Sequence, residues 1–130
     1  MKCLDTDLLV GVLRKQEKAT RKVEELDRQG RQATTAVNAF ELFYGAFKSR
    51  MVEENVREAS RLLSRLEVLP LSMSSAERAG LLFGGLELKG LPIEFRDSMI
   101  AGIALEHRLT LVTRNRRDYG RVPRLTIEEW

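Results

Sequence analysis

Apolar residues recur along the chain in short clusters separated by longer stretches with helical spacing. Leu8, Leu9, Val12 and Leu13 lie at helical intervals, which predicts a helix just after a short strand at 2–4. Short apolar clusters typical of strands and longer stretches with helical spacing alternate to the end of the chain. They predict strands at 32–37, 67–71, 109–113 and 125–127 and further helices at 17–29, 39–48, 52–65, about 75–88 and 97–105.

Residues that favour helix ends support these boundaries. Asn38 followed by Glu41, and Ser74 followed by Glu77, both have the spacing of a capping box at a helix start. Gly30 comes just after the helix at 17–29, where a glycine often ends a helix. We therefore expect one helix to be capped by Asn38 and another by Ser74.

Strands that alternate with helices require crossover connections between parallel neighbours. The sheet should therefore be mostly parallel, with four or five strands and helices on both of its faces, which is an α/β fold. The chain has 130 residues, the length of one ordinary domain. We expect a single domain over residues 1–130.

Composition excludes several classes of protein. Hydrophobic residues make up 43% of the chain and charged residues 32%, so disorder is not its main content. The single cysteine, Cys3, excludes an internal disulfide framework and a multi-cysteine zinc site, and it fits a reducing, cytoplasmic location. Asp5 and Asp7 interrupt the apolar start, which argues against a signal peptide. No apolar run approaches the roughly 18 residues of a membrane span, so we expect no membrane partner.

Acidic and amide side chains follow several of the predicted strands. Asp5 ends the first strand, Glu41 lies one turn into the helix after the second, Asp97 opens the helix before the fourth, and Asn115 and Asp118 follow the fourth. Ligands of open parallel sheets bind at the carboxyl ends of the strands, so these side chains should meet there. Each also has a plain structural interpretation, as a helix cap or turn residue, and that alternative stays open for each one taken alone.

Oxygen ligands without histidine, cysteine or lysine favour a hard cation, Mg²⁺ or Mn²⁺. We expect Asp5, Glu41 and Asp97 to bind it jointly. Such an ion can activate a water and orient a phosphodiester for cleavage, which requires no nucleophilic side chain.

Positive charge is concentrated near the same predicted site. The net charge is +3, but the segment from Arg96 to Arg124 holds seven arginines against three acidic residues and carries +4 by itself. Arginine clusters suit phosphate groups, although a solvated charged face is the equally open alternative. The arginines expected to contact the phosphates of a substrate backbone are those that flank Asp97 and Asn115, namely Arg96, Arg114, Arg116 and Arg117.

Four segments, taken in order, resemble PIN-domain ribonucleases, and most of all the VapC-type toxins of toxin–antitoxin pairs: CLDTDLLV (3–10), AVNAFELFYGA (36–46), RDSMIAGIALEHRLTLVTRN (96–115) and RDYGRV (117–122). The resemblance implies a three-layer α/β/α fold and Mg²⁺- or Mn²⁺-dependent cleavage of RNA. It places the family's acidic positions on Asp5, Glu41 and Asp97, and a fourth, often aspartate, on Asn115.

The resemblance also marks two auxiliary hydroxyls and two departures from the family pattern. Thr6 follows the first acid and Thr113 precedes the fourth position. Asp7 stands where the family usually has asparagine, and Asn115 replaces a carboxylate for which the nearby Asp118 could compensate.

Three functions compete at this point. A metal-dependent endoribonuclease toxin is the leading hypothesis, and it implies a small VapB-like antitoxin whose Arg or Lys enters the acidic pocket. A noncatalytic RNA- or protein-binding module on the same fold is the alternative. A phosphoacceptor receiver domain fits poorly, because no aspartate follows the third strand and no lysine follows the fourth. The apolar surface expected on two helices predicts a homodimer, through Phe40, Phe43, Phe47, Val56, Leu62 and Leu63.

Overall fold

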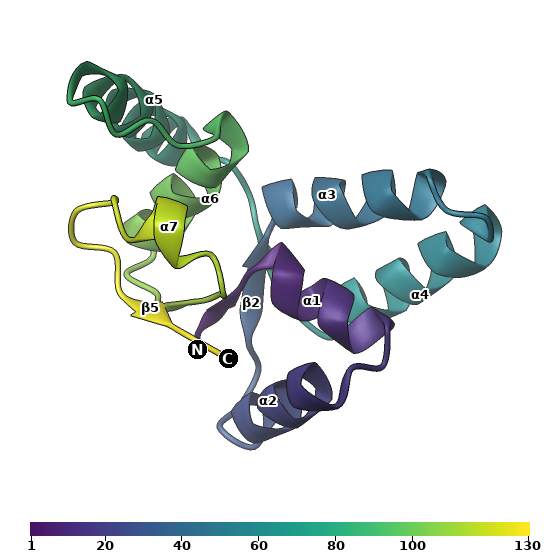
Figure 1. The fold of residues 1–130 in the computed structure, drawn as a ribbon. Helices are drawn as coiled ribbons and strands as arrows, with labels where there is room; N and C mark the ends of the chain where they lie inside the picture. Colours follow the sequence, from purple (N-terminus) through teal and green to yellow (C-terminus); the bar gives the residue numbers. More distant parts are fainter.

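Five strands of the computed structural model, which describes residues 1–130, form one sheet in the order β3-β2-β1-β4-β5, and every neighbouring pair is parallel (Figure 1). The predicted parallel α/β sheet is therefore confirmed. The elements in chain order are β1 (Cys3–Leu4), α1 (Thr6–Leu13), α2 (Glu17–Asp27), β2 (Ala33–Thr35), α3 (Ala36–Phe47), α4 (Val52–Ser64), β3 (Glu67–Leu69), α5 (Met73–Leu88), α6 (Phe95–Glu106), β4 (Leu111–Val112), α7 (Arg116–Tyr119) and β5 (Ile127–Glu128).

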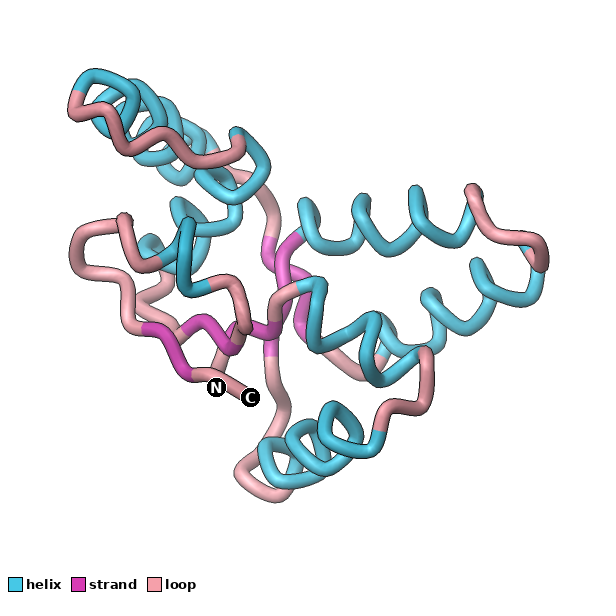
Figure 2. Tube along the Cα trace, in the orientation of Figure 1, coloured by secondary structure: helices cyan, strands magenta, loops and turns pink.

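Helices cover both faces of the sheet, which gives three layers (Figure 2). Leu4 and Val112 face a core that contains buried residues of α1, α2 and α4. Their neighbours Cys3 and Leu111 face the opposite core, which contains residues of α5, α6 and α7. The central strands are thus buried on both sides, and for this reason they are short apolar runs rather than alternating ones.

The close approach of α5 and α6 depends on Gly102. A Cβ atom at this residue would lie 2.7 Å from the carbonyl oxygen of Ser75 and 3.2 Å from the Cβ of Ala79. Only glycine allows the two helices to pack at this distance. The contact matters for function because α6 carries Asp97.

Two helix caps differ from the sequence prediction. Helix α3 begins at Ala36, its N-cap is Thr35, and Asn38 is the third helical residue, whose side chain completes a capping box with Thr35. The predicted box of Asn38 with Glu41 is wrong, because β2 ends at Thr35 and the helix starts three residues earlier. The capping box of helix α5 is also displaced toward the N-terminus, since it joins Ser72 and Ser75 rather than Ser74 and Glu77.

The other elements lie close to their predicted places. Helix α6 begins at Phe95, so Asp97 lies within its first turn rather than at its opening. The predicted turn after the fourth strand is a single helical turn, α7, which Asn115 caps by accepting a hydrogen bond from the Asp118 amide. None of the helices combines the length and the hydropathy that a membrane span requires.

Candidate active site

Asp5 lies at the carboxyl end of β1, where the chain enters α1, and it is buried. It is the N-cap residue of α1, but its side chain makes no capping hydrogen bond, so the carboxylate turns toward neighbouring strands. The hydroxyl of Thr113 donates to Asp5 Oδ2 at 2.7 Å, and the amide of Asn38 donates to Oδ1 at 3.0 Å. Thr113 directly follows β4, and Asn38 lies in the first turn of α3, just after β2, so residues that follow two neighbouring strands orient this one carboxylate.

Tyr119 links Asp5 to a second, half-buried acid, Asp97. The Tyr119 side chain is fully buried, and its hydroxyl lies 3.1 Å from Asp97 Oδ1 and 3.4 Å from Asp5 Oδ1. The single hydroxyl proton can be donated to only one of these oxygens at a time. Two carboxylates therefore face each other across one proton donor at the carboxyl edge of the sheet, which confirms that the strand ends bring Asp5 and Asp97 together.

Glu41 joins the same network through Thr6. The hydroxyl of Thr6 donates to Glu41 Oε1 at 2.7 Å and accepts a hydrogen bond from the Asn38 amide at 2.8 Å. Arg96 approaches Glu41 Oε2 at 3.8 Å, which holds the carboxylate from the other side. Glu41 is therefore oriented toward the pocket rather than used as a helix cap.

Asn115 and Asp118 complete the edge of the pocket next to Asp97. The amide of Asn115 donates to Asp97 Oδ2 at 3.3 Å, while its carbonyl oxygen caps α7. The structural interpretation of Asn115 as a cap and its place beside the acids are thus both correct. Asp118 lies close enough to hydrogen-bond with Asp97 and raise its pKa.

Burial makes the two central carboxylates reluctant to ionise. Desolvation raises the pKa of Asp5 to about 6, against the lowering effect of the Thr113 hydrogen bond. Desolvation, followed by the hydrogen bond with Asp118 and the charge of Asp5, raises the pKa of Asp97 to about 7. The pKa of Tyr119 is raised as well, by burial and by the negative charges of Asp5 and Asp97, so its hydroxyl stays a proton donor.

This donor set fits a hard divalent cation. The groups that face one another at Asp5 and Asp97 are carboxylate, hydroxyl and amide groups, and a positive charge would offset the desolvation that raises both pKa values. No three acidic side chains surround a single point closely enough to hold an ion by themselves. Mg²⁺ is commonly held by one or two carboxylates and several waters, so the pair of Asp5 and Asp97 meets its requirement.

The sequence matches the PIN domain family over residues 2–125. This chain belongs to the PIN-domain family. It is 34% identical over 127 residues to the tRNA(fMet)-specific endonuclease VapC of Shigella flexneri, an alignment that covers 98% of this chain and 96% of that protein. The chain is therefore similar to VapC ribonucleases over nearly its whole length.

Solved structures of VapBC complexes share the fold of this PIN domain. One is VapBC2 from Rickettsia felis bound to a DNA fragment from the promoter, with a TM-score of 0.90 and 32% identity over 99% of this chain and 98% of that chain. Another is DNA-bound VapBC from Salmonella typhimurium, with a TM-score of 0.88 and 34% identity over 100% of this chain and 99% of that chain. Both likenesses confirm the three-layer fold expected from the sequence.

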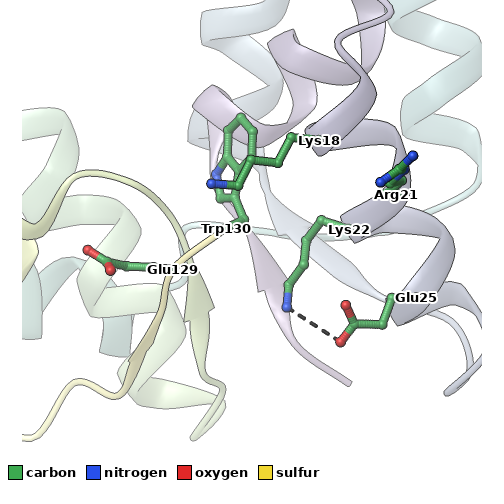
Figure 3. A pocket seen from close by; sticks show the side chains of 6 residues that line it. All are labelled: Lys18, Arg21, Lys22, Glu25, Glu129 and Trp130. Carbon is green, nitrogen blue, oxygen red and sulfur yellow. Dashed lines mark ion pairs between the residues drawn. The ribbon is translucent and has the colours of Figure 1, made fainter.

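Asp7 connects Arg114, at the edge of the PIN-domain pocket, to Trp130 through hydrogen bonds. Its Oδ2 accepts the backbone N–H of Arg114 at 2.8 Å, and its Oδ1 accepts the indole N–H of Trp130 at 3.1 Å. The Arg114 guanidinium lies 3.5 Å from the centroid of the Trp130 ring, a cation–π contact. Trp130 lies beside Lys18 of α2 (Figure 3). Gly11 of α1 leaves room for its ring, since a Cβ atom at Gly11 would lie 3.2 Å from it.

We expect Trp130→Ala to lower the free energy of unfolding by about 3 kcal/mol, because it empties a buried aromatic site. Trp130→Phe should cost less, about 1 kcal/mol, since an aromatic ring stays in the site while the hydrogen bond to Asp7 and part of the ring volume are lost. Urea unfolding followed by circular dichroism measures both, because Trp130 is the only tryptophan and its fluorescence is lost. Equal stabilities of the wild type and Trp130→Ala would show that this contact does not hold the fold.

The arginines that flank the PIN-domain pocket are more engaged than the sequence indicated. Arg96 pairs with Glu94 and Glu41, and Arg114 stacks on Trp130. Arg116 pairs with Glu129, whereas Arg117 is exposed and has no partner. All four lie near Asp97 or Asn115, as predicted, but Arg117 alone is free to contact a phosphate without breaking an existing interaction.

Two residues of the site were missed by the sequence interpretation. Asn38 was taken for a helix cap, yet its amide orients both Asp5 and Thr6. Tyr119 is not among the residues that the sequence singles out, yet its hydroxyl joins the two acids. No local pattern marks either role, because the partners of Asn38 and Tyr119 lie 33 and 114 residues away along the chain.

Proposed function

We propose that this protein is a metal-dependent endoribonuclease that acts as the toxin of a toxin–antitoxin pair. The observation that carries the proposal is the pair formed by buried Asp5 and half-buried Asp97 around one tyrosine hydroxyl, at the carboxyl edge of the sheet in a fold shared with VapC ribonucleases. A single domain over residues 1–130, acting in the cytoplasm where RNA substrates are found, completes the proposal.

Asp5 and Asp97 are proposed as the direct ligands of Mg²⁺ or Mn²⁺, and Glu41 as a carboxylate that holds the ion's water. The bound ion supplies a nucleophilic water at neutral pH and neutralises charge on the phosphodiester. The protein's own contribution is positional. Thr113 and Asn38 each donate a hydrogen bond to Asp5, which fixes the orientation of its carboxylate.

The remaining site residues are proposed to support these groups. Thr6 holds Glu41, and Asn115 holds Asp97 in the position that the resemblance gives to a fourth acid. Asp118, next to Asp97, supplies the carboxylate that Asn115 lacks. The RNA backbone is proposed to lie along Arg96, Arg114, Arg116 and Arg117, with Arg117 making the first contact.

RNA cleavage tests the proposal. Purified protein is incubated with an end-labelled tRNA transcript in Mg²⁺, in Mn²⁺ and in EDTA, and the products are separated on a denaturing gel. We expect discrete cleavage with either ion and intact RNA in EDTA. A noncatalytic binding module is the second candidate, motivated by Asn115 at the fourth position. That candidate predicts a retarded RNA band on a native gel and no cleavage with either ion.

An apolar cavity beside the acidic pocket supports the proposal that a protein partner binds here. It measures about 360 Å³, and Phe40, Phe95 and Met99 line it together with Arg96, which also contacts Glu41. We propose that a small VapB-like antitoxin places an apolar segment here and an Arg or Lys in the acidic pocket, where it replaces the metal. The partner belongs to the proposal because the two structural relatives are VapBC complexes.

A homodimer is proposed through helix α3. Phe40 is 56% exposed and Phe47 is 71% exposed, as the sequence predicted for an interface. Leu62 and Leu63 do not contribute, which corrects the prediction, because both are buried in the chain's own core under α4.

We expect sedimentation velocity at about 50 µM to show a dimer, because a specific interface of standard size holds well below this concentration. Phe47→Ser should shift the protein toward monomer. Leu81→Ser is the matched control, since Leu81 is 72% exposed on α5, away from this helix. A monomer produced by Leu81→Ser but not by Phe47→Ser would place the interface elsewhere.

A further inference from the structure

Three arginines without partners line a second cavity, at the opposite end of the sheet from the acidic pocket. Arg78 from α5, Arg108 just after α6 and Arg124 in the turn before β5 border a space of about 370 Å³. Thr110 and Thr126, which directly precede β4 and β5, add hydroxyl groups to its lining. The acidic pocket lies where β1 and β4 end, so the arginine cavity lies where the strands begin.

The positive charge of this cavity is uncompensated. No ion pair and no side-chain hydrogen bond engages any of the three guanidinium groups, all three residues are exposed, and no carboxylate lines the cavity. Another cavity, of about 480 Å³ beside α2, is different (Figure 3). There Lys22 pairs with Glu25 and Glu128, Arg21 pairs with Glu17, and the carboxylates of Glu25 and Glu129 line the cavity themselves.

Two of the three arginines occupy backbone positions that favour glycine. Arg108 has a φ of 55°, directly after the C-cap of α6, where the Leu109 amide donates to the Ala104 carbonyl at 2.9 Å. This closing pattern usually has glycine at the left-handed residue. Arg124 has a φ of 68° in a turn just after Pro123, where turns of this sequence also favour glycine. Local backbone energetics therefore disfavour arginine at both positions, and they do not account for its presence.

We propose that Arg78, Arg108 and Arg124 bind phosphates of the RNA backbone at a point remote from the cleavage pocket. The inference rests on the proposed nuclease function and adds a second contact region for its substrate. Guanidinium groups bind phosphate oxygens through paired hydrogen bonds, and the two threonine hydroxyls can donate to the same oxygens.

The lining of the cavity favours a polymer backbone over a base or a small metabolite. It contains no aromatic side chain on which a base could stack. Small-molecule sites bury most of their ligand, whereas these three arginines are exposed on an open surface. A long phosphodiester chain that crosses the surface needs neither a stacking partner nor an enclosed site.

The test is RNA binding by a variant with Arg78→Gln, Arg108→Gly and Arg124→Gly. Binding of a fluorescein-labelled tRNA transcript is followed by fluorescence anisotropy in EDTA at several salt concentrations. We expect the Kd to rise at least about tenfold and the slope of log K against log salt to become shallower by about two, the share of three phosphate contacts. Both glycine substitutions relieve a positive φ, so the melting temperature should not fall.

The control removes the same charge elsewhere, through Arg28→Gln, Arg50→Gln and Arg57→Gln, at exposed arginines that also lack ion pairs. Equal affinities of the two triple variants would overturn the proposal, because general charge would then explain the binding. Pyrophosphate binding is measured for the same arginine variant. Its loss with unchanged RNA affinity would assign the cavity to a free phosphate compound and overturn its assignment to RNA. Arg78→Gln alone leaves both turns intact and should weaken RNA binding about threefold, which settles the matter if the triple variant fails to fold.

Cleavage by the wild type is measured on the same RNA with Mn²⁺. Cleavage by the wild type together with unchanged binding by the arginine variant contradicts the cavity proposal alone. Binding that depends on the three arginines, without any cleavage, supports the cavity and contradicts the nuclease function.

Discussion

Adding Mn²⁺ to metal-free protein should raise its melting temperature, and the rise should be larger at pH 8 than at pH 5. An ion that binds only the native state at about 100 times its Kd contributes about 2.7 kcal/mol, or roughly 10 °C for a chain of this size. At pH 5 the protons on Asp5 and Asp97 compete with the ion, because their pKa values of about 6 and about 7 lie above that pH. Differential scanning fluorimetry at both pH values measures the effect.

The matched control for this metal effect is Asp27→Asn, which removes an exposed carboxylate that pairs with Arg65 on the surface. It should keep the full Mn²⁺ response, whereas Asp5→Asn should lose it. An equal response in the two variants would show that Mn²⁺ binds outside the acidic pocket.

The second large effect is expected from Asp97→Asn, which should abolish cleavage yet stabilise the metal-free fold above pH 7. Loss of a direct metal ligand should slow cleavage at least about 1,000-fold, the equivalent of several kcal/mol of transition-state stabilisation.

The stability gain follows from the pKa of Asp97, which is about 7 in the folded protein and about 3.8 as a free carboxyl group. Between these values the native state binds more protons than the unfolded state, so rising pH destabilises the wild type, and the penalty is complete above pH 7. Asparagine removes this penalty. Urea unfolding in EDTA should therefore show Asp97→Asn as the more stable protein at pH 8 and no such advantage at pH 4. A loss of stability at pH 8 would contradict the electrostatic account.

Much of this fold follows from local sequence patterns. The apolar clusters that begin with Leu8 and Leu9 identify helices, and their alternation with short strands requires a parallel sheet. The proximity of Asp5 and Asp97 then follows from topology, because Asp5 follows β1 and Asp97 lies in the first turn of α6, the helix that leads back into the neighbouring parallel strand β4. This proximity could be predicted because it needed only the order of the elements.

Helix caps and shared hydrogen bonds could not be predicted in the same way. Asn38 fits the start of one capping box with Glu41 as well as the third position of another with Thr35, and the local pattern does not distinguish them. Tertiary contacts determine which capping box forms, because the Asn38 side-chain amide donates a hydrogen bond to Asp5, which follows a different strand. Pairings such as Arg114 with Trp130 likewise join residues whose proximity only the folded chain determines. The same is true of the three arginines of the second cavity, which come from three separate elements.

The most direct test of the metal-dependent nuclease is a Mn²⁺ titration that records ion binding and RNA cleavage in the same samples. Bound Mn²⁺ is measured from the loss of its electron paramagnetic resonance signal, for the wild type and for Asp97→Asn. The account predicts that cleavage by the wild type rises in proportion to bound Mn²⁺, and that the variant shows neither at the same concentrations. Cleavage in EDTA, or equal cleavage by Asp97→Asn, would contradict it.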